Sequence, residues 1–200
     1  RAGRLVSGDR EGVIGAGANM THKSEKSARK RAGSFMKART GPDGLHLFDR
    51  TTGTNVLFEE LQVPEHRWSR APRQVSIALT NSCDLACGYC YAPKQPAVLA
   101  LEHVLSWADE LDAEGCLGIG FGGGEPTLYR QLSQLCQRIT RKTSLAVTVT
   151  THGHRWTPAL VEELRGAIHF VRVSVDGVDG SYEQLRGRRF DDLMARLDLI

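Results

Sequence analysis

Four β-rich runs alternate with four helical patterns between residues 74 and 200, and this alternation limits the possible folds more than any other feature. The runs cover residues 74–80, 116–121, 145–150 and 169–175. Each run is followed by apolar residues at helical spacing, and Gly115 and Thr157-Pro158 are typical of helix boundaries. Such βα units predict a parallel sheet with helical crossovers. Because the crossovers are right-handed, the units must wind into an open sheet or a barrel.

Unusual residues follow the end of each run. Three cysteines lie at 83–90 after the first run, a glycine-rich segment at 122–125 after the second, and Thr-His-Gly at 151–153 after the third. Asp-Gly at 176–177 ends the fourth run. Parallel α/β folds bind their ligands at the carboxyl ends of the strands. We therefore expect one binding site formed by these four segments.

The composition divides the chain into three parts. Residues 1–43 are predicted to be a disordered basic leader, residues 44–73 a β-hairpin and linker, and residues 74–200 the βα core. The hairpin strands are predicted at 45–48 and 55–58. We expect the hairpin to cap one end of the core rather than to guide a substrate. The chain begins with Arg1 and stops at Ile200 inside a helical pattern, so we interpret it as a fragment.

The charge is concentrated in the leader. Residues 1–40 hold 10 Lys and Arg against 3 Asp and Glu, although the net charge of the whole chain is only +3. A basic tail can bind nucleic acid or an anionic membrane, but solvated disorder is the more common meaning, so we do not expect nucleic-acid binding. No apolar run reaches membrane-spanning length and no signal-peptide pattern is visible, which predicts a cytoplasmic protein without membrane contact.

Five cysteines occur, and three of them are clustered as Cys83, Cys87 and Cys90. An odd count without a secretory signal argues against a disulfide framework and favours a metal site. Three thiolates leave one iron of a [4Fe–4S] cluster open for chemistry, whereas structural zinc needs four ligands. Zinc is the alternative, with a fourth ligand drawn from His66, His103, His152 or His154. The other two cysteines, at 116 and 136, are expected in the hydrophobic core.

The C-x3-C-x2-C spacing, with Tyr89 before the last cysteine, resembles the signature of the radical S-adenosylmethionine (SAM) superfamily. The resemblance implies a partial (β/α)6 TIM-like barrel, present here for about four units, with the cluster bound by Cys83, Cys87 and Cys90. It implies that SAM chelates the open iron and that Tyr89 lies near the adenine. It also implies cleavage of SAM to a 5′-deoxyadenosyl radical, which abstracts hydrogen from a substrate, and an external electron donor such as a reductase or flavodoxin.

The segment that follows the second run resembles the family's GGEP motif. The resemblance implies that Gly123, Gly124, Glu125 and Pro126 contact the amino group of SAM. Residues 151–153 resemble a Thr-Asn-Gly segment of many relatives, with His152 in place of Asn. We interpret His152 as a solvent-facing loop residue.

The segment 174–188 resembles peptide-modifying members of the family, including anaerobic sulfatase-maturating enzymes and other SPASM-type maturases. The resemblance implies that Ser174 and Arg186 contact SAM, with Arg186 paired to its carboxylate. Arg188 and Arg189 lie close enough in sequence to be alternatives. Ser174 and Asp176 at a strand end also suit recognition of ribose hydroxyls or a carboxylate.

The leading hypothesis is an enzyme that performs SAM-dependent radical chemistry on a peptide or protein side chain. The peptide preference depends on the family resemblance alone. A small-molecule radical SAM enzyme of cofactor biosynthesis is the alternative within the same class. A non-catalytic zinc or iron–sulfur binding module is the alternative from another class.

Overall fold

The computed structural model describes residues 36–200, so most of the expected leader lies outside the described residues. Two sheets are present in this part of the chain. The first is antiparallel, with the order β1-β2-β3, and comprises β1 (Met36–Gly41), β2 (Gly44–Asp49) and β3 (Asn55–Phe58). The second is parallel, with the order β4-β5-β6-β7, and comprises β4 (Gln74–Thr80), β5 (Gly118–Gly123), β6 (Ala146–Thr151) and β7 (Phe170–Val173).

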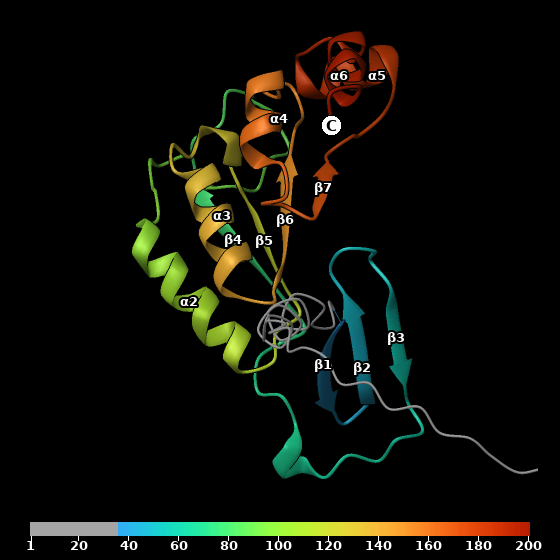
Figure 1. Ribbon diagram of the computed structural model, residues 1–200. Helices are drawn as coiled ribbons and strands as arrows, with labels where there is room; N and C mark the ends of the chain where they lie inside the picture. The colour runs from blue at the N-terminus through green and yellow to red at the C-terminus, as the bar shows by residue number, and fades with distance from the viewer. Residues whose placement is uncertain (1–35) are drawn as a thin grey trace, which may run out of the picture. The chain divides into compact units, whose positions relative to one another are not determined.

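Helices follow each strand of the parallel sheet. They are α2 (Leu101–Ala113), α3 (Leu132–Lys142), α4 (Pro158–Leu164), α5 (Asp179–Arg186) and α6 (Phe190–Leu197), with short 3-10 turns at Glu65–Arg67 and Pro126–Leu128. Helices α2, α3 and α4 lie along one side of the sheet (Figure 1). The expected α/β class and the four βα units are therefore confirmed. No described helix combines the length and the apolar character needed to cross a lipid bilayer.

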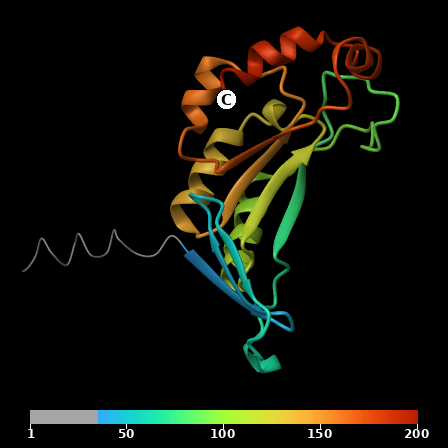
Figure 2. The ribbon, with the colours of Figure 1, turned by 90° about the vertical axis from the view of Figure 1, so that its right-hand side faces the viewer.

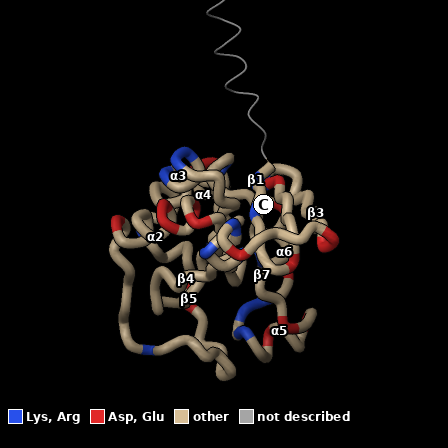
Figure 3. The backbone as a smooth tube through the Cα atoms, turned by 90° about the horizontal axis from the view of Figure 1, so that it is seen from below, with Lys and Arg blue, Asp and Glu red and all other residues tan. Residues whose placement is uncertain are grey.

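The core lies between the parallel sheet and these helices. Strand residues Ile119, Phe121, Val147 and Val149 are fully buried on the helix-facing side. They pack against the predicted apolar stripes of α2 and α3, which include Val104, Leu105, Leu135 and Ile139. Cys116 and Cys136 are also buried in this core, as expected. Figure 3 marks charged positions along α3, α4 and α5.

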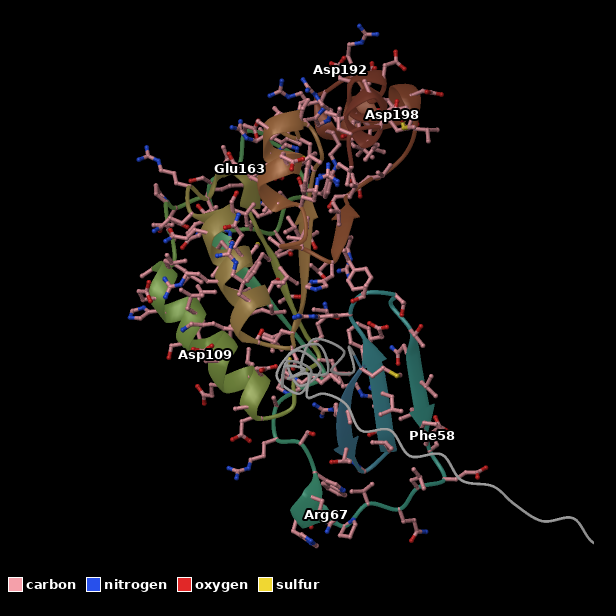
Figure 4. The ribbon with its side chains drawn as sticks, in the orientation of Figure 1. Phe58, Arg67, Asp109, Glu163, Asp192 and Asp198 are labelled. Carbon is pink, nitrogen blue, oxygen red and sulfur yellow. The ribbon has the colours of Figure 1, made fainter. Side chains whose placement is uncertain are left out.

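A side-chain hydrogen bond connects two of the helices that cover the sheet. Ser133 of α3 donates a 2.8 Å hydrogen bond to the Glu163 carboxylate of α4 (Figure 4). The predicted N-cap of α4 is confirmed, because Thr157 Oγ1 accepts a hydrogen bond from the Leu160 amide and Pro158 occupies the first turn.

The boundary predicted for the leader is wrong at its last residues. Met36–Gly41 forms β1 and pairs antiparallel with β2, so the expected hairpin is a three-stranded sheet. The polar sequence of β1 gives little strand signal. Its tertiary contacts stabilise it instead: Lys37 forms an ion pair with Asp112 of α2, and Arg39 donates to the carbonyl of Ala71.

The small sheet contacts the amino-terminal ends of the parallel strands. The Arg50 guanidinium donates to the Thr143 and Leu145 carbonyls at 2.9 and 3.1 Å, just before β6 begins. The loop between β4 and α2 lies at the opposite end, together with α5 and α6 (Figure 2). The contacts thus lie at the end of the core opposite the cysteine loop, which is consistent with a capping role.

Two helical segments begin in ways that the sequence pattern alone does not reveal. Leu128 belongs to a 3-10 turn rather than to α3, because the side chain of Glu125 caps the turn that Pro126 begins. Residues 179–186 form α5. Its Asp-Gly start resembles a turn signal, and only Tyr182 provides a buried apolar anchor.

Candidate cofactor site

The cysteine loop follows β4 and is closed at its base by backbone pairing. The Leu99 amide donates to the Leu79 carbonyl at 2.9 Å, and Asn81 donates to Ala97 at 3.0 Å. These bonds hold the two ends of a long loop together, with an additional bridge between Thr80 and Val98. The cysteines therefore extend from a fixed base at the carboxyl end of the first parallel strand.

The backbone at Gly123 and Gly124 joins the base of the cysteine loop to the end of β5. The Gly124 amide donates to Thr80 O at 2.7 Å, and the Glu125 amide donates to Ser82 O at 2.8 Å. Gly123 has a φ of +116°, and a Cβ at either glycine would collide with the backbone oxygens of Thr80 or Ser82. Glycine is thus required here by the close approach of two protein segments.

Glu125 is completely buried beneath the site. One carboxylate oxygen accepts hydrogen bonds from Thr127 and from the Thr151 hydroxyl at 2.7 and 2.8 Å, and the other accepts from the His152 amide at 2.9 Å. Protein donors thus occupy this carboxylate, and the contact between Glu125 and the amino group of SAM stays a prediction. Both Glu125 and the buried Pro126 lie behind the cavity wall, and the Glu125 carboxylate joins the loops after β5 and β6.

His152 is buried, with 5% of its surface exposed, so its interpretation as a solvent-facing residue is wrong. Its Nε2 atom lies 2.9 Å from Asp84 Oδ1 and 3.3 Å from Glu125 Oε2. Its Nδ1 atom accepts a hydrogen bond from the His154 amide. His152 therefore connects the cysteine loop, through Asp84, with the segments after β5 and β6. The sequence offered one signal, the replacement of Asn by His, but it could not reveal the partner Asp84.

One cavity of about 430 Å³ lies at this end of the sheet. Its lining includes most of the residues expected at the site: Cys83, Cys87, Cys90, Tyr89, Gly123, Gly124, Ser174 and Arg186. They come from the loops after β4 and β5, from the end of β7 and from α5. The volume is within the usual range for small-ligand sites.

Arg186 connects two walls of this cavity. It forms an ion pair with Asp176, its guanidinium carbon lies 5.6 Å from the centre of the Tyr89 ring, and its Nη1 lies 4.0 Å from Cys87 Sγ. Its buried Nε has no hydrogen-bond partner among the described residues. Arg186 is thus placed at the cysteine loop and lines the cavity. Arg188 also reaches this loop, through a 3.8 Å ion pair with Asp84, but it is half exposed and does not line the cavity, and Arg189 pairs with Asp191 on the surface.

Asp176 lies beside the cavity and is not part of its lining. The Tyr89 hydroxyl donates to Asp176 at 2.6 Å, and this hydrogen bond, together with Arg186, lowers the pKa of the carboxyl. The Tyr89 pKa is raised by burial and by the same hydrogen bond. Asp176 therefore stays ionised and orients Tyr89 and Arg186.

The donor set fits an iron–sulfur cluster. Three free thiols line one cavity, and the described residues provide no fourth cysteine there. Burial raises the pKa of the Cys83 thiol, so a bound cation is needed to hold it as thiolate near neutral pH. Another donor set is also present, because ligand atoms of Cys83, Asp84 and His152 lie within 4.8 Å of one another.

Comparisons with known proteins place these residues in context. The chain is 31% identical over 149 residues to sporulation killing factor maturation protein SkfB of Bacillus subtilis, a match that covers 72% of this chain and 36% of SkfB. It is 30% identical over 131 residues to GTP 3′,8-cyclase of Haemophilus influenzae, covering 61% of this chain and 39% of the cyclase. The chain thus spans less than half the length of these relatives.

The fold is similar to that of solved enzymes. The structure of Streptococcus suis SuiB bound to S-adenosylmethionine superimposes with a TM-score of 0.63 at 17% identity, covering 82% of this chain and 52% of SuiB. A structure of anSMEcpe with bound AdoMet superimposes with a TM-score of 0.51 at 20% identity, covering 63% of this chain and 39% of that one.

A family model provides the assignment. Residues 77–200, which contain all four carboxyl-end segments described above, match the model of the radical SAM superfamily. The cofactors of this superfamily are a [4Fe–4S] cluster and SAM. The chain belongs to the radical SAM superfamily.

Proposed function

We propose that the chain forms the cluster-binding and SAM-binding part of an enzyme that modifies a peptide or protein side chain. When bound, the reduced [4Fe–4S] cluster supplies the electron that cleaves SAM and thereby provides a radical able to take hydrogen from a substrate. The observation that carries the proposal is that Cys83, Cys87 and Cys90 line a single cavity together with Arg186.

Each side chain has a distinct task in this proposal. The three thiolates hold the cluster, and Arg186 binds the SAM carboxylate, because its Nε has no protein partner and its guanidinium lies at the cysteine loop. Tyr89 and Ser174 line the space for the nucleoside. The backbone at Gly123 and Gly124 receives the amino group, since the Glu125 carboxylate is already occupied by protein donors.

The preference for a peptide substrate has support from the relatives. SkfB is named as a maturation protein, mycofactocin maturase MftC is 28% identical over 131 residues, and SuiB has been solved bound to precursor peptide SuiA. A reductase or flavodoxin-type protein would supply the electron. We place the reaction in the cytoplasm, where reducing conditions keep cysteines free, as all five are here.

A small-molecule substrate is the second candidate. The similarity to GTP 3′,8-cyclases favours it. Incubation of the reconstituted, reduced enzyme with SAM and either GTP or a set of short peptides separates the two. The candidate that increases the rate of 5′-deoxyadenosine formation and itself changes mass is the substrate class.

Anaerobic reconstitution tests the central proposal. The protein should turn brown with iron and sulfide, and it should form 5′-deoxyadenosine from SAM in the presence of dithionite. Cys87→Ala should lose both properties, whereas Cys136→Ala, which alters a cysteine buried in the core, should keep them. A colourless protein that retains zinc would support the Cys83–Asp84–His152 donor set and contradict the proposal. SAM cleavage in Cys87→Ala would contradict the assignment of the cysteines.

A further inference from the structure

The parallel sheet has two chemically different faces. Side chains alternate between the faces along each strand, and the helix-facing set is apolar and buried. The opposite, inner face carries small or polar residues and a single cation. It consists of Ser76, Ala78, Gly118, Gly120, Gly122, Ala146, Thr148, Thr150, Arg172 and Ser174, with Gln74 and Phe170 at its amino-terminal end.

Every inner position of β5 is glycine. Neither Gly120 nor Gly122 has a positive φ, so their backbone conformation does not require glycine, whereas a Cβ at Gly118 would lie only 3.2 Å from the Ala146 carbonyl oxygen. A Cβ at Gly122 would lie 3.8 Å from Thr150 Cβ, and one at Gly120 would lie 3.4 Å from Ser76 Oγ, which are ordinary contacts. Glycine within a strand costs about 0.5–1 kcal/mol relative to alanine. Such a strand marks a place where a ligand approaches the backbone, so β5 leaves room for an occupant.

Arg172 lies on β7, and Thr150 of the intervening strand β6 separates it from the glycines of β5. The register pairs Ala78 with Gly122 and Thr150 with Arg172, so these four positions form one level across the inner face. Arg172 lines the same cavity as the three cysteines. Its exposed side chain makes no hydrogen bond or ion pair with any residue in the described range 36–200, and no Asp or Glu lines the cavity. The other guanidinium in the cavity, that of Arg186, is neutralised by Asp176.

We propose that Arg172 binds a carboxylate of the substrate, with the Thr150 hydroxyl as a neighbouring donor and the glycine strand providing space. This inference rests on the proposed function. Arg172 precedes Ser174 by two residues on the same face, which places it about 7 Å deeper toward the amino-terminal end. A carboxylate held there puts the substrate between the sheet and the level of the cysteine loop. Under the peptide proposal, the carboxylate is that of an Asp or Glu side chain or of a chain terminus.

The planar fork of arginine matches a carboxylate through two parallel hydrogen bonds, and a phosphate offers the same chemistry. Differential labelling with the arginine reagent phenylglyoxal distinguishes a carboxylate ligand from a phosphate ligand. Reconstituted protein is labelled in the presence of SAM, so that the SAM site is filled, and labelled peptides are mapped by mass spectrometry. Arg172→Gln identifies the peptide by its loss, and Arg165, on the outer end of α4, is the reference.

N-acetyl-aspartate N-methylamide should slow the labelling of Arg172 about five-fold at about four times its Kd, without affecting Arg165. The matched neutral compound, N-acetyl-asparagine N-methylamide, should give no protection at equal ionic strength. Protection by inorganic phosphate but not by the aspartate compound would overturn the carboxylate assignment. If the labelling rate of Arg172 is the same with the aspartate compound, the asparagine compound and phosphate, Arg172 is not part of an anion-binding site.

Two further measurements separate the possible failures. Formation of 5′-deoxyadenosine by the same preparation reports on the proposed function. If the protein forms 5′-deoxyadenosine but the aspartate compound does not protect Arg172 from labelling, only the Arg172 inference is contradicted. Gly122→Ala tests the space over β5, because its methyl group would lie 3.8 Å from Cβ of Thr150, the proposed neighbouring donor. It should raise the aspartate concentration needed for half-protection, whereas Gly180→Ala, at a position with open surroundings, should not. Unchanged half-protection in Gly122→Ala would contradict the assigned role of β5.

Discussion

The Nε2 atom of His152 lies 2.9 Å from Oδ1 of Asp84, although the two residues are 68 positions apart. Since Nδ1 of His152 accepts a hydrogen bond from the His154 amide, the neutral ring carries its proton on Nε2 and donates to Asp84. Asp84 is part of the cysteine loop, between Cys83 and Cys87. One buried imidazole therefore links that loop to the end of β6.

Replacing His152 tests this link. His152→Ala should lower the free energy of unfolding by about 1–3 kcal/mol, because Asp84 and Glu125 lose a buried partner. It should also reduce the iron retained after reconstitution. Urea unfolding and iron analysis measure the two effects, and His103→Ala, at an exposed position of α2, serves as the control. If His152→Ala has the stability and the iron content of the wild type, the contact between His152 and Asp84 is dispensable.

The buried position of Glu125 leads to a second prediction. In Glu125→Gln, an amide nitrogen must face donors from Thr127, Thr151 or His152, so we expect a loss of about 1–3 kcal/mol in stability. Thermal unfolding without cofactors measures this loss. Glu163→Gln, which replaces an exposed carboxylate on α4, should change the midpoint temperature of thermal unfolding little. A variant of Glu125 that is fully stable but fails to bind SAM would instead support direct ligand contact.

Stability should depend on pH through His169. Burial and the nearby charge of Arg50 lower the pKa of His169 from 6.5 to about 4, and its Nδ1 accepts a hydrogen bond from the Val147 amide. The unfolded state therefore binds the proton first as pH falls, and stability decreases between about pH 6.5 and pH 4, by at most about 3 kcal/mol.

His169→Asn provides the comparison, because its side-chain oxygen can still accept from Val147 but does not titrate. Urea unfolding at a series of pH values should show a smaller decrease in this variant across that window. His103→Asn should keep the wild-type dependence. Identical pH profiles for wild type and His169→Asn would contradict the prediction.

Arg50 should control the attachment of the small sheet. Arg50→Ala removes hydrogen bonds to the Thr143 and Leu145 carbonyls. Amide hydrogen exchange in β1–β3 should become faster, while exchange in α2 and α3 stays as in the wild type. Arg67→Ala, in the exposed turn at Glu65–Arg67, is the matched control. Uniform acceleration across both sheets would indicate global destabilisation instead.

The amino-acid sequence by itself determined the parallel βα order and the main members of the site. Periodicity predicted the strands that became β4–β7, because burial on one face of a strand or helix leaves a regular apolar pattern. Parallel strands share one carboxyl end, so the cysteines, Gly123, Gly124 and Ser174 could be assigned to one site before their positions were known. Arg186 was assigned to this site by the family resemblance alone.

Only the tertiary structure decided which of these side chains reach the cavity. Glu125 faces protein donors, Asp176 orients Tyr89 and Arg186, and His152 is buried against Asp84. These contacts join residues from different loops, and local sequence patterns carry no information on such pairings. Arg172 shows the same limit. Alternation assigns it to a face, but the lack of a partner for its side chain depends on what the other strands of the sheet place on that face.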